Sequence, residues 1–234
     1  MTPATSLDGL RANAEAAGLA LRGGFYPESE DGVPAFPDGG AVQTIVLFGF
    51  VGSEQWPMFA ASAEHTDGRA NALDRWSRRV IDALGSHHGG TALYPSDGPP
   101  WLPFQRWARR AEPVHVSPLG VLIHPDFGLW HSYRGALCFP TRWALPEPDR
   151  RSSPCSACAD KPCLHTCPVG AWAPGQFDQL ACGNHVASKD GADCLHLSCR
   201  ARRSCPIGAA FRYSAAQSKF HMAAFLGAAE NGAS

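Results

Sequence analysis

The hydrophobic positions of this chain switch between helical and extended spacing along its first 145 residues. Apolar residues at helical spacing predict three helices there, over residues 6–17, 70–84 and 104–110. Apolar and β-branched runs predict strands over residues 19–25, 44–51, 91–94, 120–123 and 130–139. Strands that alternate with helices indicate a layered α/β domain.

Local signals predict where several of these elements end. Ser6 is placed to cap the first helix, and Gly85 predicts the end of the second. Residues 95–100, rich in proline, predict a turn. Residues 146–154 have the composition of a polar linker, and residues 215–226 predict a last helix beyond it.

Length and net charge limit the classes of protein to which this chain can belong. The 234 residues suffice for one large domain or two modest ones. The net charge of −1 gives no global basic field, so nucleic acid is not expected as a partner. The longest apolar run, residues 45–52, is too short to span a bilayer, and the first 20 residues lack the pattern of a signal peptide. We therefore expect a cytoplasmic protein that does not interact with a membrane.

The nine cysteines are unevenly distributed. None precedes Cys138, and eight of them lie between Cys155 and Cys205. Cys138 is the odd one, and its place on an apolar strand predicts a small core residue. The crowding predicts two domains, residues 1–148 and residues 149–234. In a reducing compartment such cysteines are not expected to form disulfides.

The eight cysteines form two runs, and each run ends in Cys-Pro followed by a closely related phrase, Cys167-Pro-Val-Gly-Ala and Cys205-Pro-Ile-Gly-Ala. In two-cluster ferredoxins the cysteine before proline ligates the cluster of the other run. Two 4Fe–4S clusters are therefore predicted. A first set of ligands comprises Cys155, Cys158, Cys163 and Cys205. A second set comprises Cys167, Cys182, Cys194 and Cys199. The spacings within the runs are longer than usual, and structural zinc is the alternative.

Residues 117–137 carry two histidines, an arginine and several small residues on a strand, a polar turn and a second strand. Glycines in such a stretch allow the backbone to approach a large planar ligand. The alternative is an ordinary β-hairpin with core aromatic residues.

This segment also carries a family resemblance. The phrase G-V-L-I-H-P-D-F-G-L-W-x3-R-G resembles the corrin-binding segment of cobalamin-processing (CblC-type) chaperones. The frame S-P-L-G-V-x6-G-x-W is similar to the segment that follows the catalytic region in epoxyqueuosine reductases and reductive dehalogenases. The resemblance implies an α+β protein, in which a nitroreductase-like (CblC-type) α/β domain is followed by a two-cluster bacterial ferredoxin-like domain.

The resemblance further implies that the first domain binds base-off cobalamin. Backbone contacts to the corrin would come from Leu119, Gly120, Val121, Leu122 and Ile123. Its other neighbours would be His124, Phe127, Gly128, Trp130 and Arg134. Asp97, in an Asp-x-x-Pro phrase, matches a proton donor of epoxyqueuosine reductase and would act as a general acid if its carboxyl group is buried. The alternative for Asp97 is a plain turn residue.

Three functions follow as expectations. The first is delivery of electrons from two 4Fe–4S clusters to cobalamin, with an external electron donor, for reduction or processing of that cofactor. The second is a cobalamin-dependent reductase of an organic substrate, related to epoxyqueuosine reductase. The third is a plain ferredoxin-type electron carrier without cobalamin. The His-Pro-x-Phe-Gly phrase favours the first.

Overall fold

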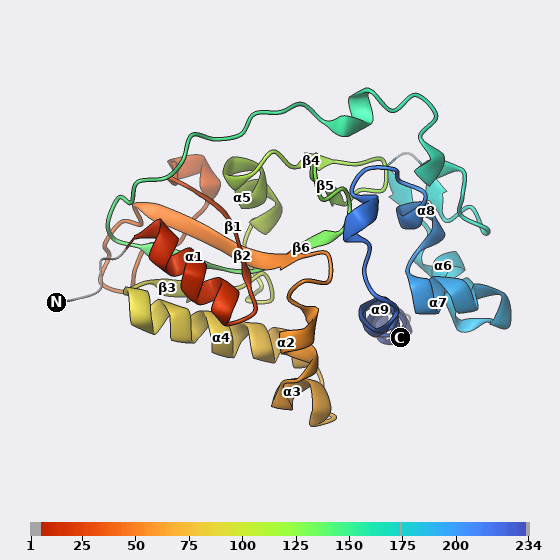
Figure 1. Ribbon diagram of the computed structural model, residues 1–234, viewed down its shortest axis with the longest axis horizontal. Helices are drawn as coiled ribbons and strands as arrows, with labels where there is room; N and C mark the ends of the chain where they lie inside the picture. The colour runs from red at the N-terminus through yellow and green to blue at the C-terminus, as the bar shows by residue number, and fades with distance from the viewer. Residues whose placement is uncertain (1–5, 174, 233–234) are drawn as a thin grey trace. The chain divides into compact units, whose positions relative to one another are not determined.

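The computed structural model describes residues 6–173 and 175–232 (Figure 1). Backbone contacts divide the chain into two compact units. The first unit contains the chain up to Pro113 and the segment Ser132–Arg150. The second contains the segment Val114–His131 and the chain from Arg151 onward. The sequence assigned residues 114–131 to the first domain, whereas their backbone contacts group them with the second unit.

The first unit is built on a four-stranded sheet in the order β1-β2-β6-β3. Its strands are β1 (Ala20–Phe25), β2 (Thr44–Val51), β3 (Thr91–Leu93) and β6 (His131–Phe139). β1 pairs antiparallel with β2, and β3 pairs antiparallel with β6. The unit is thus a mixed α/β fold, with each strand close to its predicted position.

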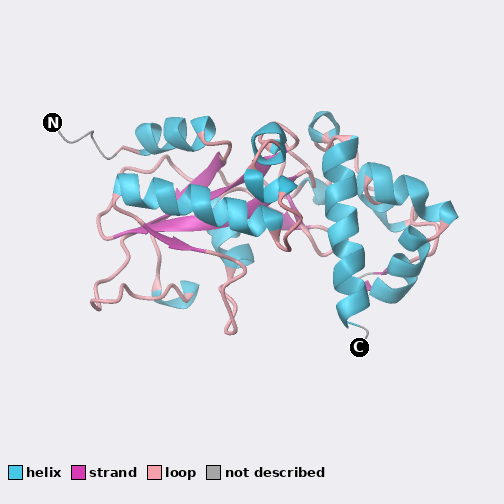
Figure 2. Ribbon diagram, turned by 90° about the horizontal axis from the view of Figure 1, so that it is seen from below, coloured by secondary structure: helices cyan, strands magenta, loops and turns pink. Residues whose placement is uncertain are grey.

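Every residue of β2 is buried, which requires cover on both faces of the sheet. Helices α1 (Leu7–Ala16) and α4 (Ala72–His88) cover one face, and α5 (Phe104–Ala111) covers the other (Figures 1 and 2). The continuous apolar run of residues 44–51 therefore marks a buried strand, as predicted. Two short helices that the pattern did not predict follow β2, α2 (Trp56–Ala60) and α3 (Ala63–Thr66).

Two helix ends test the predicted signals. Ser6 caps α1, since its Oγ accepts a hydrogen bond from the Gly9 amide at 3.1 Å. Gly85 does not end α4, which continues to His88 and ends at Gly89, whose φ is 72°. The predicted end at Gly85 is wrong because this glycine serves packing: a Cβ there would lie 2.6 Å from the Gly90 carbonyl oxygen.

The second unit consists of short elements followed by one long helix. Its strands form two small hairpins, β4 (His115–Val116) with β5 (Leu122–Ile123), and β7 (Trp172–Ala173) with β8 (Gln176–Phe177). Its α-helices are α6 (Gln179–Ala187), α7 (Ala192–Leu197), α8 (Arg200–Arg203) and α9 (Ala215–Gly232). The predicted last helix corresponds to α9, which packs against α6 and α7. None of the described helices has the length and apolar character needed to cross a membrane.

The interpretation of residues 117–137 as an ordinary hairpin is wrong. β5 pairs with β4, whereas β6 belongs to the four-stranded sheet. Between them the chain makes a tight turn, in which His124 and Gly128 exchange backbone hydrogen bonds of 2.8 and 2.9 Å.

Candidate functional site

The first set of cysteines surrounds a cavity of about 210 Å³ in the second unit. Cys155, Cys158 and Cys163 line it together with Cys205, which belongs to the other run. The remaining lining is mostly apolar and includes Pro118, Ile123 and Ile207. Four thiols from both runs therefore face one small apolar space.

The cysteines of the second set also lie near one another. Burial raises the pKa of the Cys182 thiol to about 12, and the nearby thiols of Cys199, Cys167 and Cys194 add to that rise. Cys167 is the member that comes from the first run. Each group of neighbouring thiols therefore contains one cysteine from the other run.

The thiols of the first set influence each other in the same way. Burial raises the pKa of Cys163, with further contributions from Cys205, Cys155 and Cys158. Buried thiols without a metal keep their protons, and binding of a metal or cluster must displace them. Within residues 6–173 and 175–232, no three or more His, Cys, Asp or Glu side chains are grouped so as to hold a single metal ion.

Backbone amides point at several of the sulfur atoms. The Ala171 amide donates a hydrogen bond to Cys167 Sγ at 3.4 Å. The Ile207 amide donates to Cys205 and the Arg200 amide to Cys194, and both bonds lower the pKa of the thiol against the larger effect of burial. Donors to sulfur favour the thiolate, which is the form that binds a metal.

The basic residues between the cysteines are largely paired. Arg200 binds Asp193 through two hydrogen bonds of 2.7 and 2.8 Å, and Arg203 binds the same carboxylate. These arginines lower the pKa of Asp193 to about 2. Lys161 donates to the Cys158 carbonyl oxygen at 3.1 Å and lines the cavity. These basic side chains therefore form ion pairs and hydrogen bonds within the second unit.

Arg202 differs from its neighbours because it contacts aromatic rings. Its guanidinium carbon lies 4.4 Å from the ring centres of both Trp130 and Tyr213. Its Nε donates to the Leu129 carbonyl oxygen at 3.1 Å. Arg202 thus joins α8 to the segment that carries the predicted corrin contacts.

That segment packs directly on the first set of cysteines. Leu119, Ile123 and Leu129 share a buried apolar cluster with Cys163 and Cys205. A Cβ on Gly128 would lie 2.0 Å from the Ile207 carbonyl oxygen, and a Cβ on Gly208 would lie 2.2 Å from the Phe127 carbonyl. Gly128 therefore allows its own backbone to lie close to the backbone of residues 207–208, which follow Cys205.

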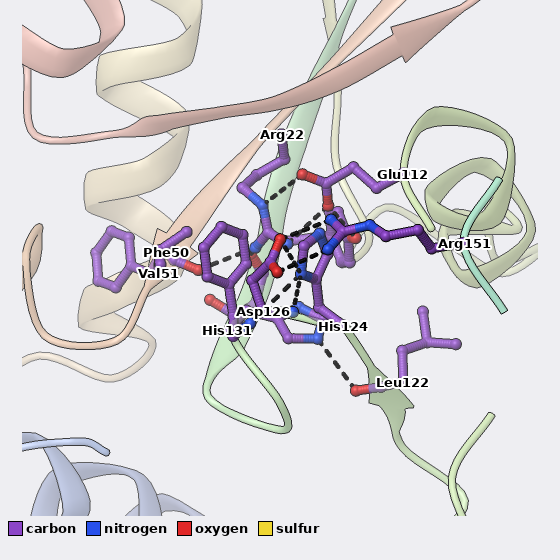
Figure 3. A network of polar contacts seen from close by, with 12 residues as sticks. Arg22, Phe50, Val51, Glu112, Leu122, His124, Asp126, His131 and Arg151 are labelled. Carbon is purple, nitrogen blue, oxygen red and sulfur yellow. Dashed lines mark hydrogen bonds and ion pairs between the residues drawn. The ribbon is translucent and has the colours of Figure 1, made fainter. Parts of the chain in front are cut away.

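His124 shapes the turn that ends this segment. Its Nδ1 accepts hydrogen bonds from the amides of Asp126 and Phe127 at 3.0 and 3.4 Å, and its ring stacks on Phe127 at 4.2 Å. Asp126 in turn binds Arg151 at 2.6 and 2.7 Å, which lowers the pKa of Asp126 (Figure 3). Since Nδ1 is an acceptor, the neutral imidazole carries its proton on Nε2.

The predicted corrin contacts occupy three different environments. Buried positions are held by Leu119, Ile123, His124, Gly128 and Trp130, whereas Leu122 and Phe127 are partly exposed. Gly120 and Val121 are exposed, and a Cβ on Gly120 would meet open space. Arg134 lies in the first unit, where it pairs with Asp74 and Ser77 of α4. A flat ligand therefore has access mainly to the backbone at Gly120 and Val121.

Asp97 lies in the first unit, in the turn after β3. Its carboxylate pairs with Arg78 at 2.5 Å, and its side chain is 43% exposed. The general-acid role depended on a buried carboxyl group, and this degree of exposure does not meet that condition.

Trp172 was not predicted as a site residue, yet it packs against the buried cluster around Cys163 and Cys205. A signal was present in the repeat itself. The phrase Cys167-Pro-Val-Gly-Ala continues with Trp172, whereas Cys205-Pro-Ile-Gly-Ala continues with Ala210. A large aromatic residue at one of two matched positions indicates a local difference between the two halves.

No protein-family model matches the sequence, and no match to a curated protein was found. One similar solved structure is that of an epoxyqueuosine reductase with an epoxyqueuosine-modified tRNA-Tyr stem loop. It matches with a TM-score of 0.47 and 15% identity, over 91% of this chain and 68% of that one. The likeness concerns the mixed α/β fold alone and gives no support for a CblC-type domain or for cobalamin.

The comparison corrects one prediction. Nucleic acid was not expected as a partner because the chain carries no global basic charge. The similar protein was solved with a tRNA stem loop, and nucleic acid is therefore no longer excluded as a partner. Net charge describes the whole chain and says nothing about a local surface that contacts phosphates.

Proposed function

We propose that this chain is an iron–sulfur electron-transfer protein whose two 4Fe–4S clusters are held by sets of cysteines that exchange one ligand. The observation that supports this most directly is the cavity that Cys205 lines together with Cys155, Cys158 and Cys163. Four thiolates around one space, the last of them followed by proline, match the donor set of such a cluster.

Each part of the second unit has a definite task in this proposal. The cysteines supply thiolates, the amides of Ala171, Ile207 and Arg200 stabilise their charge, and Leu119 and Ile123 shield the first set from water. Bound clusters supply one-electron chemistry, at potentials set by charge, hydrogen bonds and exposure.

For the electron acceptor we propose base-off cobalamin, and for the source an external donor in the cytoplasm. The support is the resemblance of residues 117–137 to corrin-binding segments, together with the open backbone at Gly120. Residues 119–130 pack on the first set of cysteines, so a corrin bound along them would lie close to that set.

Anaerobic preparation tests the iron–sulfur part. We expect about eight iron and eight acid-labile sulfide per chain, and an EPR signal after reduction with dithionite. The matched control is Cys138→Ser, which keeps all eight ligands and should keep the iron content. Colourless protein that contains zinc and no sulfide would overturn this part.

Addition of hydroxocobalamin to the loaded protein tests the acceptor. We expect stoichiometric uptake and the EPR signal of base-off Co(II) after reduction. The variant Gly120→Val, which places a branched side chain at the open backbone, should weaken uptake without changing the iron content. Binding of tRNA is measured in the same preparation. A loaded protein that takes up no cobalamin would leave an electron carrier whose acceptor is another molecule.

A further inference from the structure

The indole nitrogen of Trp172 is a buried hydrogen-bond donor without a partner. Trp172 Nε1 is one of several such side-chain atoms among the described residues. The ring is held in place by Phe177, with its centre 4.1 Å away and the planes at 23°. A donor buried in this way is unfavourable unless something accepts its hydrogen.

The surroundings of Trp172 limit what the acceptor can be. Trp172 packs against the buried cluster that contains Cys163 and Cys205, and Cys155 and Cys199 pack against the same cluster. Apart from these cysteines, the side chains of the cluster are hydrocarbon. The side-chain acceptors available there are sulfur atoms, and three of the four cysteines belong to the first set.

We propose that Trp172 donates its indole N–H to a sulfur of the iron–sulfur cluster held by the first set, and thereby raises the reduction potential of that cluster. The inference rests on the proposed function. Reduction adds one electron to a cluster that is already negative, and a donor stabilises the more negative form.

The repeat predicts that the two clusters differ in this respect. The position that corresponds to Trp172 in the second run is Ala210, which has no donor. Electrons move toward the centre of higher potential. The Trp172 donor therefore favours electron transfer from the cluster of the second set to the cluster of the first set, next to residues 119–130.

The test compares Trp172→Phe with the loaded wild-type protein. Phenylalanine keeps an aromatic ring against Phe177 but removes the N–H. We expect the equilibrium constant for reduction of the first cluster to fall about tenfold, which is 59 mV for one electron. The potential of the second cluster should not change. The first cluster is identified as the one whose EPR signal is absent from Cys205→Ser.

The matched control is Trp143→Phe. Trp143 also packs against a phenylalanine, Phe139, with ring centres 4.1 Å apart and planes tilted by 32°, but its Nε1 already donates to Thr141 Oγ1 at 3.1 Å. Its replacement should leave both potentials unchanged. Unchanged potentials in Trp172→Phe with full iron content, or a shift of the second cluster alone, would overturn the inference.

A second measurement does not depend on the variant's stability. In reduced wild-type protein with ¹⁵N-labelled indole nitrogens, electron–nuclear double resonance should detect one nitrogen coupled to the first cluster. Absence of that coupling in a fully loaded protein would overturn the inference and leave the proposed function intact. A wild-type protein without iron and sulfide would instead overturn the proposed function.

Discussion

The guanidinium of Arg22 binds the carboxylate of Glu112 through two parallel hydrogen bonds of 3.0 and 2.7 Å (Figure 3). The Arg22 side chain is 1% exposed. Its Nη1 donates to the carbonyl oxygens of Phe50 and Ser132 at 3.0 and 3.3 Å, and the Tyr133 hydroxyl donates to Glu112 at 2.6 Å. This network ties the edge strand β1 to β2, β6 and the end of α5.

Removal of one charge from this pair should destabilise the first unit strongly. Glu112→Gln leaves the buried guanidinium of Arg22 without its counter-charge, and such a loss costs about 3–5 kcal/mol. Urea unfolding, monitored by aromatic fluorescence, measures the change. The control Asp97→Asn breaks the half-exposed pair with Arg78 and should cost less than about 1 kcal/mol. Equal effects of the two variants would show that the Arg22 network has no special role in stability.

The proposed exchange of ligands between the two runs predicts which cysteine variants share a defect. Cys163→Ser and Cys205→Ser should remove the same EPR signal, although these residues lie in different runs, because both line one cavity. Cys167→Ser and Cys199→Ser should remove the other signal. If Cys205→Ser instead matches Cys199→Ser, each run holds its own cluster and the exchange is refuted.

The backbone contact between residues 127–128 and 207–208 makes Gly208 sensitive to substitution. Gly208→Ala places a Cβ 2.2 Å from the Phe127 carbonyl carbon, so the two backbones must separate. We expect a loss of several kcal/mol in stability and slower loading with iron. The control is Gly170→Ala, at the same place in the first run, with a φ of 61° and nothing within 4 Å. Backbone strain alone should cost that control about 1–2 kcal/mol.

Cys138 gives a prediction about pH. Burial raises the pKa of its thiol from 9.0 to about 12. The folded state therefore keeps a proton that the unfolded state loses, and the stabilisation is full below pH 9 and lost as the pH rises toward 12. Relative to Cys138→Ala, the wild-type protein should lose stability over that interval, by up to about 1.4 kcal/mol per pH unit. Parallel pH profiles of the two proteins would contradict a buried thiol.

Local sequence patterns predicted the first unit well. The run of residues 44–51 and the Ser6 cap depend on neighbours along the chain, and both were found as predicted. The end of α4 was missed because Gly85 is a glycine for a tertiary reason, the close approach of Gly90. The Arg22–Glu112 pair was missed because its members are 90 residues apart and nothing in the local pattern marks a buried charge.

The cysteine repeat of the second unit is visible in the sequence, whereas the extent of that unit was not predicted correctly. The two Cys-Pro endings are a repeat that the sequence displays directly. Residues 114–131 were assigned to the first domain because they come before the predicted linker. Position along the chain does not reveal that this segment packs with residues after the linker. The pairing of β5 with β4 was missed because strands of two residues give no periodicity to detect.

The cysteine-bearing unit is discontinuous along the chain, and this limits how it can be handled. A fragment that begins at residue 149 would contain every cysteine of both sets but would lack Leu119, Ile123 and Leu129. Its cavity would open on one side to water and dissolved oxygen. Transplanting the two sets of cysteines into another protein therefore requires the eighteen-residue segment Val114–His131 as well, joined through a new linker in place of the sheet strand that now follows it.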